Sequence, residues 1–303
     1  MIYNNITETI GNTPILKLNA ISKESKSEIF AKLEYFNPGS SIKDRPAYSI
    51  IKNMIDDNKL KKGDTIVEAT SGNMGIGLAM VASALGYNIV IVMPDSMSIE
   101  RQKIIASYGA KLELTPGKDG MKGAIKKAEE ISSQDGYVMA YQFENKNNSL
   151  AHEKTTAIEI LKDIPDLDAV VAGVGTGGTI SGIAKILKEN NPNIKIYAVE
   201  PEDSPVISGG KAGAHKIQGI GAGFIPSILE MDLIDEVIKV SSEESYNASR
   251  ELAKKEGILM GVSGGAALAA SIKVAKKLSG NKKILYIVPD NGERYLSTDL
   301  YNL

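Results

Sequence analysis

The sequence predicts an α/β protein of two lobes, each a mostly parallel sheet covered by helices. Short apolar segments alternate with helical patterns along the chain, which is typical of parallel sheets with helices on both faces. The length of 303 residues allows roughly two domains with substantial cores. Several glycine- or serine-rich loops follow the predicted strands, so we expect a ligand-binding cleft between the lobes, where the strands end.

The individual elements follow from the spacing of apolar residues. Apolar runs predict strands at 28–35, 64–70, 88–93, 111–115, 137–140, 169–174, 195–200, 237–240 and 283–289, and a short strand in the segment GNTPILKL. Helical patterns occupy 46–54, 71–86, 98–108, 121–132, 149–161, 180–189, 243–256 and 266–278.

Composition excludes several kinds of function. The 35 basic and 37 acidic residues give a net charge of −2, without a basic face for nucleic acid. The absence of cysteine excludes a thiolate metal site and a cysteine nucleophile, and only two histidines, His152 and His215, make a catalytic triad or a histidine-rich metal site improbable. There is no signal-like segment and no apolar run long enough to cross a membrane, so we expect a cytoplasmic protein without membrane contact.

Lys43 is the candidate for covalent chemistry. It lies in the segment NPGSSIKDR, where a turn follows the predicted strand 28–35 and a helical pattern begins immediately afterwards. A lysine at such a junction can have its pKa lowered by desolvation and nearby positive charge, which a Schiff-base lysine requires. A lysine taken alone is more often a solvated surface charge, so the assignment depends on the rest of the chain.

The loop GVGTGGT, residues 173–179, is a candidate phosphate site. Its backbone N–H groups can converge at a helix N-terminus, which attracts anions, and Thr176 and Thr179 add hydroxyl groups. The same loop fits the G-x-G-x-x-G pattern of dinucleotide-binding proteins, and Glu200 lies where their ribose-binding acid is expected. A nicotinamide cofactor is therefore an alternative, although it would leave Lys43 and the other loops without a role.

Two further loops have both a functional and a structural interpretation. TSGNMG, residues 70–75, could bind a carboxylate through its N–H groups and the hydroxyls of Thr70 and Ser71, or it could be an ordinary helix cap. In GVSGGA, residues 261–266, the Ser263 hydroxyl could contact the ring nitrogen of a heteroaromatic cofactor, or it could be an N-cap. An amine, a phosphate site, a carboxylate site and a neutral ring partner together indicate pyridoxal phosphate holding an amino acid.

The chain resembles the cysteine synthases (O-acetylserine sulfhydrylases), which are β-family, fold type II enzymes dependent on pyridoxal phosphate. The resemblance runs from GNTPILKL to ERYLSTDLY and rests on six motifs in the same order: NPGSSIKDR, TSGNMG, QFEN, GVGTGGT, HKIQGIGAGFIP and GVSGGA. It implies a large cofactor-binding domain of residues 1–39 and 148–303 and a smaller mobile substrate domain of residues 40–147.

The resemblance also implies a role for each matching residue. Lys43 would be the Schiff-base lysine and general base, and Ser263 would contact the pyridine nitrogen. The other cofactor-binding residues would be Asn73, Gly175, Thr176, Gly177, Gly178 and Thr179. The substrate carboxylate would be bound by Thr70, Ser71, Asn73 and Gln142. The implied reaction is β-replacement through an aminoacrylate intermediate, giving L-cysteine from O-acetyl-L-serine and sulfide.

Met74 departs from the family, which usually has threonine there, and Lys146 stands where proline is common. The bulkier, softer Met74 side chain could reshape the substrate pocket, so cysteine or serine remains an alternative donor, as in a lanthionine or cystathionine synthase or a sulfide-releasing cysteine lyase. The sequence does not decide the donor or the physiological thiol. The resemblance further implies a homodimer and docking of a serine acetyltransferase C-terminal tail.

Overall fold

The computed structural model describes residues 1–302, which form two compact units. The first unit contains residues 1–10 and 37–148, and the second contains residues 11–36 and the chain from residue 149 onward. The sequence-based division placed residues 1–39 in the larger domain. In the structure residues 1–10 and 37–39 belong to the first unit, and Ile10 packs on its apolar core. Within residues 1–302, no helix is long and apolar enough to span a membrane.

The first unit is built on a four-stranded parallel sheet with the order β5-β4-β3-β6. Its strands are β3 (Thr65–Ala69), β4 (Asn88–Pro94), β5 (Lys111–Thr115) and β6 (Tyr137–Met139). Its helices are α2 (Asp44–Asp56), α3 (Asn73–Leu85), α4 (Ile99–Ser107) and α5 (Gly120–Ser132), with 3-10 turns η1 (Ile6–Thr9) and η3 (Gly117–Asp119).

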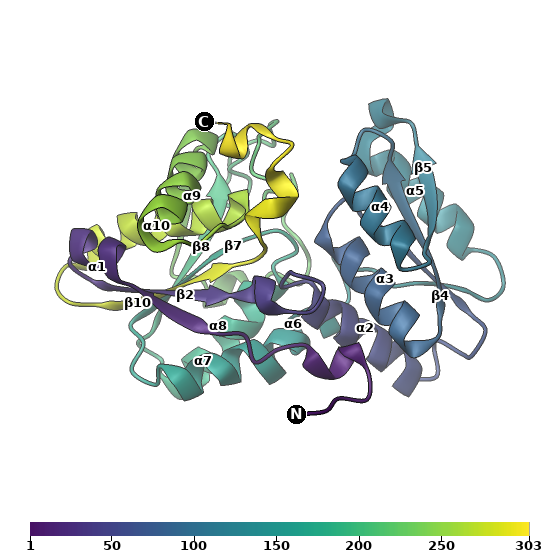
Figure 1. The fold of residues 1–303 in the computed structure, drawn as a ribbon, viewed down its shortest axis with the longest axis horizontal. Helices are drawn as coiled ribbons and strands as arrows, with labels where there is room; N and C mark the ends of the chain where they lie inside the picture. Colours follow the sequence, from purple (N-terminus) through teal and green to yellow (C-terminus); the bar gives the residue numbers. More distant parts are fainter. Residues whose placement is uncertain (303) are drawn as a thin grey trace. The chain divides into compact units, whose positions relative to one another are not determined.

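Helices cover both faces of this sheet, as Figure 1 shows. Val67 and Val90 pack with Ala124 of α5 on one face. Ile66 and Ile91 point to the other face, where they pack with α2, α3 and α4. Because successive strand residues alternate between the faces and both faces are buried, the strands read as nearly continuous apolar runs.

The second unit contains a six-stranded sheet with the order β1-β2-β10-β7-β8-β9, parallel except for β1, which pairs antiparallel with β2. Its strands are β1 (Ile15–Leu18), β2 (Glu28–Leu33), β7 (Ala169–Gly173), β8 (Lys195–Pro201), β9 (Glu236–Val240) and β10 (Lys283–Val288). Its α-helices are α1 (Asn19–Ser25), α7 (Ala157–Asp163), α8 (Gly178–Asn190), α9 (Ser242–Glu256) and α10 (Val262–Leu278), and α6 (Asn147–Ala151) crosses the boundary between the units. Short turns complete it: η2 (Glu34–Phe36), the π-helical η4 (His152–Thr156), η5 (Met231–Leu233), η6 (Gly292–Tyr295) and η7 (Asp299–Tyr301).

One large core cluster of the second unit lies on one face of its sheet. There Ile29, Val171 and Tyr286 pack with α1, α9 and α10, while α7 and α8 lie on the opposite face (Figure 1). The predicted α/β class with mostly parallel sheets is therefore confirmed.

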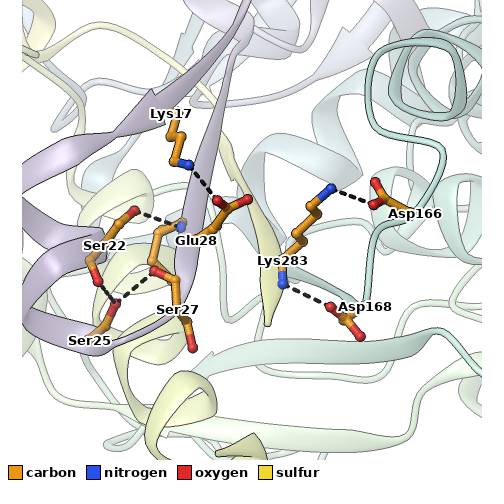
Figure 2. Close-up of polar contacts among 9 residues, drawn as sticks. Lys17, Ser22, Ser25, Ser27, Glu28, Asp166, Asp168 and Lys283 are labelled. Carbon is orange, nitrogen blue, oxygen red and sulfur yellow. Dashed lines mark hydrogen bonds and ion pairs between the residues drawn. The ribbon is translucent and has the colours of Figure 1, made fainter. Parts of the chain in front are cut away.

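The amino ends of the central strands are held by polar contacts, several of which Figure 2 shows. Asp168 accepts a hydrogen bond from the Lys283 backbone N–H at 2.9 Å, and Lys283 also pairs with Asp166. The Ile29 N–H donates to Ser22 Oγ at 2.9 Å, which fastens α1 to the start of β2. These contacts fix the amino ends of the strands, and the candidate ligand-binding loops lie at the opposite, carboxyl ends.

Two helices differ from their predicted bounds by more than the one or two residues seen at the ends of the others. The predicted helix 149–161 is divided by the π-helical turn His152–Thr156 between α6 and α7. Helix α10 begins at Val262, four residues before the predicted start at residue 266. Within this first part of the helix, Gly265 packs closely on α9, where a Cβ atom would lie 2.1 Å from the Ser245 carbonyl oxygen, so this position requires glycine. A glycine-rich segment that looks like a loop in the sequence is therefore the first turn of a buried helix.

Candidate active site

Lys43 lies at the N-cap position of α2, at the end of a loop that folds back on the helix. The Gly39 N–H donates to Asp44 Oδ2 at 2.5 Å, and the Lys43 N–H donates to Ser41 Oγ at 3.2 Å. Helix α3 packs directly against this point, because a Cβ atom at Gly77 would lie 3.1 Å from the Lys43 carbonyl oxygen. The Lys43 backbone is thus fixed from two sides, while the residue remains partly exposed.

The loop 70–73 leads into α3 without a side-chain cap. Gly72 is the N-cap residue, and as a glycine it has no side chain that could cap the helix. The interpretation as an ordinary capped helix is therefore wrong for this loop. Thr70 Oγ1 accepts a hydrogen bond from the Gly72 N–H at 3.4 Å, so the hydroxyl and the helix start lie side by side. An uncapped N-terminus of this kind is suited to an anion such as a carboxylate.

Arg101 supports this loop and was not found by sequence reasoning. Its guanidinium donates from Nη1 to the Ser71 carbonyl oxygen at 3.3 Å, and the residue is buried. It lies in the first turn of α4, whose N-cap is Ser98. The sequence shows only an arginine near the start of a predicted helix, which does not distinguish it from a surface arginine.

Gln142 lies beside a buried acid, Glu68, on β3. The Gln142 backbone N–H donates to Glu68 Oε2 at 3.2 Å, and its Nε2 donates to Glu68 Oε1 at 3.4 Å and to the Ala69 carbonyl oxygen at 3.3 Å. Asn148 Nδ2 donates to the Gln142 carbonyl oxygen at 2.8 Å. The first unit therefore brings Gln142 next to the strand that leads directly into Thr70 and Ser71. Sequence reasoning missed Glu68, although an acid within an apolar strand directly before a glycine-rich loop is a recognisable signal.

Glu68 is expected to make the stability of the protein depend on pH. Burial raises the pKa of its carboxyl from 4.5 to about 7. Between these values the folded protein binds more protons than the unfolded chain, so Glu68 lowers stability as the pH rises. Glu68→Gln removes this titration. We expect the free energy of unfolding of the variant, relative to the parent, to increase by up to about 3 kcal/mol between about pH 4.5 and about pH 7.5.

Urea unfolding at a series of pH values measures this difference. Glu129→Gln on the exposed side of α5 is the matched control, and it should show no comparable trend. A Glu68→Gln difference that stays constant across the range would contradict a buried, titrating carboxyl.

Met74, in the first turn of α3, is buried in the apolar core of the first unit. It packs in the same cluster as Met80, Met93 and Ile105. An effect of Met74 on substrate choice would therefore act through the shape of the loop 70–75, and it stays a prediction.

In the second unit, the loop 175–179 connects β7 to α8. Gly177 is the N-cap of α8 and has φ of +86°, which favours glycine. A Cβ atom at Gly175 would lie 2.4 Å from the Gly219 carbonyl oxygen, so the close approach of these two segments requires glycine. The N-cap residue Gly177 has no side chain to cap α8, and Thr176 Oγ1 accepts a hydrogen bond from the N–H of Gly178, the first residue of the helix, at 3.5 Å. The loop thus presents N–H groups and hydroxyls without a basic side chain, a donor set that fits one phosphate group.

Ser263 is the second residue of α10 and is buried. The N-cap is Gly261, and no side chain caps the helix, so the interpretation of Ser263 as an N-cap is wrong. A Cβ atom at Gly219 would lie 3.8 Å from Ser263 Oγ. Gly219 therefore lies between the loop 175–179, called the phosphate-type loop below, and Ser263. The second unit thus brings the predicted phosphate site and the predicted ring-nitrogen contact close to the same residue.

Glu200 does not behave as a ribose-binding acid. Its carboxylate accepts hydrogen bonds from the Ile207 N–H at 2.8 Å and from the Ser208 N–H at 3.1 Å, and Ser208 Oγ donates to it at 2.5 Å. The residue is buried and fixes the segment that follows β8. Because these contacts occupy the Glu200 carboxylate, the dinucleotide interpretation lacks an acid that would bind the ribose.

Comparison with known families matches residues 6–290 to the pyridoxal-phosphate dependent enzymes. The chain belongs to this family. A cysteine synthase of Staphylococcus aureus (strain Mu50 / ATCC 700699) is 52% identical over 301 residues, covering 99% of this chain and 97% of the relative. The predicted cofactor is thereby confirmed, and the nicotinamide alternative is wrong.

Two solved structures show the same architecture. A cysteine synthase from Entamoeba histolytica has a TM-score of 0.97 at 46% identity, covering all of this chain (100%) and 92% of that chain. A hydrogen sulfide-producing enzyme from Fusobacterium nucleatum has a TM-score of 0.93 at 44% identity, covering 97% of this chain and 100% of that chain. The predicted resemblance to the cysteine synthases and the fold type II architecture are confirmed.

Proposed function

We propose that the protein is a cysteine synthase that replaces the β-acetoxy group of O-acetyl-L-serine by sulfide, giving L-cysteine and acetate. The observation that carries the proposal is the 52% identity to a cysteine synthase over 99% of the chain. The site geometry supports it, because each unit has a helix start with a glycine N-cap, at residues 70–73 and at residues 175–179, and such helix starts are suited to anions.

Each predicted residue has a defined task in this reaction. Lys43 Nζ would hold the cofactor covalently, and the same amine, when free, would take the proton from the substrate Cα. The bound cofactor supplies the electron sink for loss and addition of the β-substituent. Ser263 Oγ is a neutral hydrogen-bond partner for the ring nitrogen.

The remaining residues bind anionic or polar groups. The N–H groups and hydroxyls of the loop 175–179 hold the phosphate, and Asn73 contacts the ring oxygen. The substrate α-carboxylate is held by the N–H and side-chain donors of Thr70, Ser71, Asn73 and Gln142.

A second candidate function uses cysteine as the donor and releases sulfide. Two observations favour it: Met74 departs from the family pattern within the substrate loop, and the chain is 44% identical to the hydrogen sulfide-producing enzyme of F. nucleatum.

The assay that separates the two functions compares cysteine formation from O-acetylserine and sulfide with sulfide release from cysteine alone. We expect the first rate to be at least about tenfold higher in kcat/KM. A higher rate with cysteine would replace the proposed function by the second one.

Met74→Thr tests whether this position influences the donor. We expect the ratio of kcat/KM for O-acetylserine to that for cysteine to rise by about 2- to 10-fold in the variant, because the shape of the substrate loop changes. Met80→Leu, a conservative change in the same apolar cluster, is the control. An unchanged ratio in Met74→Thr would contradict a role in donor choice.

Two expectations about assembly remain part of the proposal. The family resemblance supports a homodimer, which light scattering of the purified protein measures directly. It also supports binding of a serine acetyltransferase C-terminal tail, for which a synthetic tail peptide is the probe in a calorimetric titration. We also propose a cytoplasmic location on the same basis.

A further inference from the structure

A fully buried histidine lies directly behind the phosphate-type loop. His152 has 0% exposure and is the first residue of the π-helical turn His152–Thr156. Its Nε2 atom lies 3.2 Å from Thr179 Oγ1, and its Nδ1 atom lies 2.9 Å from Thr156 Oγ1. Both ring nitrogens are therefore in contact with threonine hydroxyls, and one of these hydroxyls belongs to the loop 175–179. Neither His152 nor His215 has a role in the proposed cysteine synthase reaction.

The backbone around this contact is closely packed. A Cβ atom at Gly182 of α8 would lie 2.3 Å from the Ser149 carbonyl oxygen and 2.9 Å from His152 Cβ. Glycine at this position therefore lets α8 lie directly against the segment that carries His152. Because Gly182 is less than one helical turn after Thr179, the same contact fixes the distance between the imidazole and the Thr179 hydroxyl. π-Helical turns within α-helices are also frequent at functional sites.

The numbers of hydrogen-bond donors and acceptors on the phosphate, Thr179 and His152 decide which group donates between His152 and Thr179. A phosphate oxygen only accepts hydrogen bonds, so the single Thr179 hydroxyl proton must point to the phosphate. The Thr179 oxygen can then accept a hydrogen bond from His152 Nε2–H. In a neutral imidazole the other nitrogen is an acceptor, so Nδ1 accepts from the Thr156 hydroxyl. The opposite tautomer would draw the Thr179 proton to the imidazole and turn oxygen lone pairs toward the phosphate.

We propose that His152 is a positioning residue for the cofactor phosphate, and that its neutral Nε2–H tautomer holds Thr179 as a donor. The proposal rests on the pyridoxal-phosphate binding assigned above but not on the choice of substrate. It places Thr156, His152 and Thr179 in one directed chain of hydrogen bonds that ends at the phosphate. Thr156 and His152 are fully buried, so the contact between them is shielded from water, while Thr179 is partly buried.

The tautomer can be measured in the unmodified holoenzyme. The sequence contains only His152 and His215, so a protein labelled with ¹⁵N-histidine gives signals from two rings, and His215→Gln assigns them. We expect the His152 ring to be neutral and protonated at Nε2. A ring protonated at Nδ1 alone would overturn the proposal, and this measurement needs no variant of His152.

A double-mutant cycle tests whether His152 acts through Thr179. His152→Leu removes the donor, whereas His152→Gln offers an amide N–H close to the position of Nε2. We expect His152→Leu to raise the dissociation constant for pyridoxal phosphate about tenfold and to shift the ³¹P resonance, and His152→Gln to restore most of both. In a Thr179→Ala background, His152→Leu should add less than about twofold. Thr155→Ala is the matched control, because its hydroxyl bonds to the Ala151 carbonyl oxygen in the same turn, and the affinity should not change.

The outcomes separate this proposal from the proposed reaction. Equal losses of affinity from His152→Leu in both backgrounds would mean a general structural role and would overturn the inference. If the holoenzyme binds the cofactor as described but forms no cysteine from O-acetylserine, the proposed reaction fails while this inference stands.

Discussion

Lys43→Ala is expected to lower kcat/KM for cysteine formation by about 10³-fold or more, because in the proposed reaction Lys43 is both the covalent anchor and the base that moves the Cα proton. The fold should be unaffected, since Lys43 is the partly exposed N-cap of α2 and its backbone contacts remain. The measurement is the initial rate of cysteine formation, made with cofactor in excess so that weaker binding is not mistaken for lost chemistry.

Lys52→Ala provides the matched control on the same helix. The Lys52 side chain is 47% exposed and pairs with Asp56 on the surface, so its removal should leave the rate unchanged. Retention of more than about a tenth of the activity in Lys43→Ala would mean that another group performs the proton transfer.

Lys32→Ala is expected to lower the free energy of unfolding by about 3 kcal/mol. Lys32 lies on β2 with a fully buried side chain, and its ammonium contacts Glu159 Oε2 at 2.7 Å and the Thr13 carbonyl oxygen at 2.6 Å. Its loss leaves the Glu159 carboxylate, which is 14% exposed, without this cation. Removing one member of a buried ion pair costs more than the pair contributes, because the remaining charge is poorly solvated. Urea unfolding of the cofactor-free proteins gives the difference.

Lys17→Ala is the control for this effect. Lys17 lies on β1, next to β2, and pairs with Glu28 (Figure 2) at 2.5 Å. Its side chain, however, is 45% exposed. An exposed pair contributes less than about 1 kcal/mol, so this variant should be nearly as stable as the parent. Similar losses from the two variants would contradict the claim that burial makes the Lys32 contact important.

Most of the sheet structure could be predicted because both faces of each sheet are covered. The predicted strand 111–115 matches β5 (Lys111–Thr115), and the predicted strand 88–93 differs from β4 (Asn88–Pro94) by one residue. Helix α1 was not predicted, since its seven residues bury only Ile21 and give little periodic signal. The division of the predicted helix 149–161 was also missed, because a π-helical turn depends on packing that no local pattern reports.

Part of the candidate site could also be predicted from the sequence, and part could not. Lys43 and the loops at residues 70–73 and 175–179 could be found because glycine-rich segments directly after apolar strands are a local signal. Glu68 and His152 act through residues that are 74 and 27 positions away along the chain. Such partners depend on which elements the fold brings together, so sequence spacing alone does not reveal them.

The visible absorption spectrum of the purified protein tests the central claim most directly. We predict a band near ~410 nm from pyridoxal phosphate bound to an amine, absent in Lys43→Ala, and reduction with borohydride followed by peptide mapping should place the cofactor on Lys43. O-Acetylserine should abolish the band and sulfide should restore it. Protein that shows no such band after incubation with pyridoxal phosphate, or that carries the label on another lysine, would contradict the account.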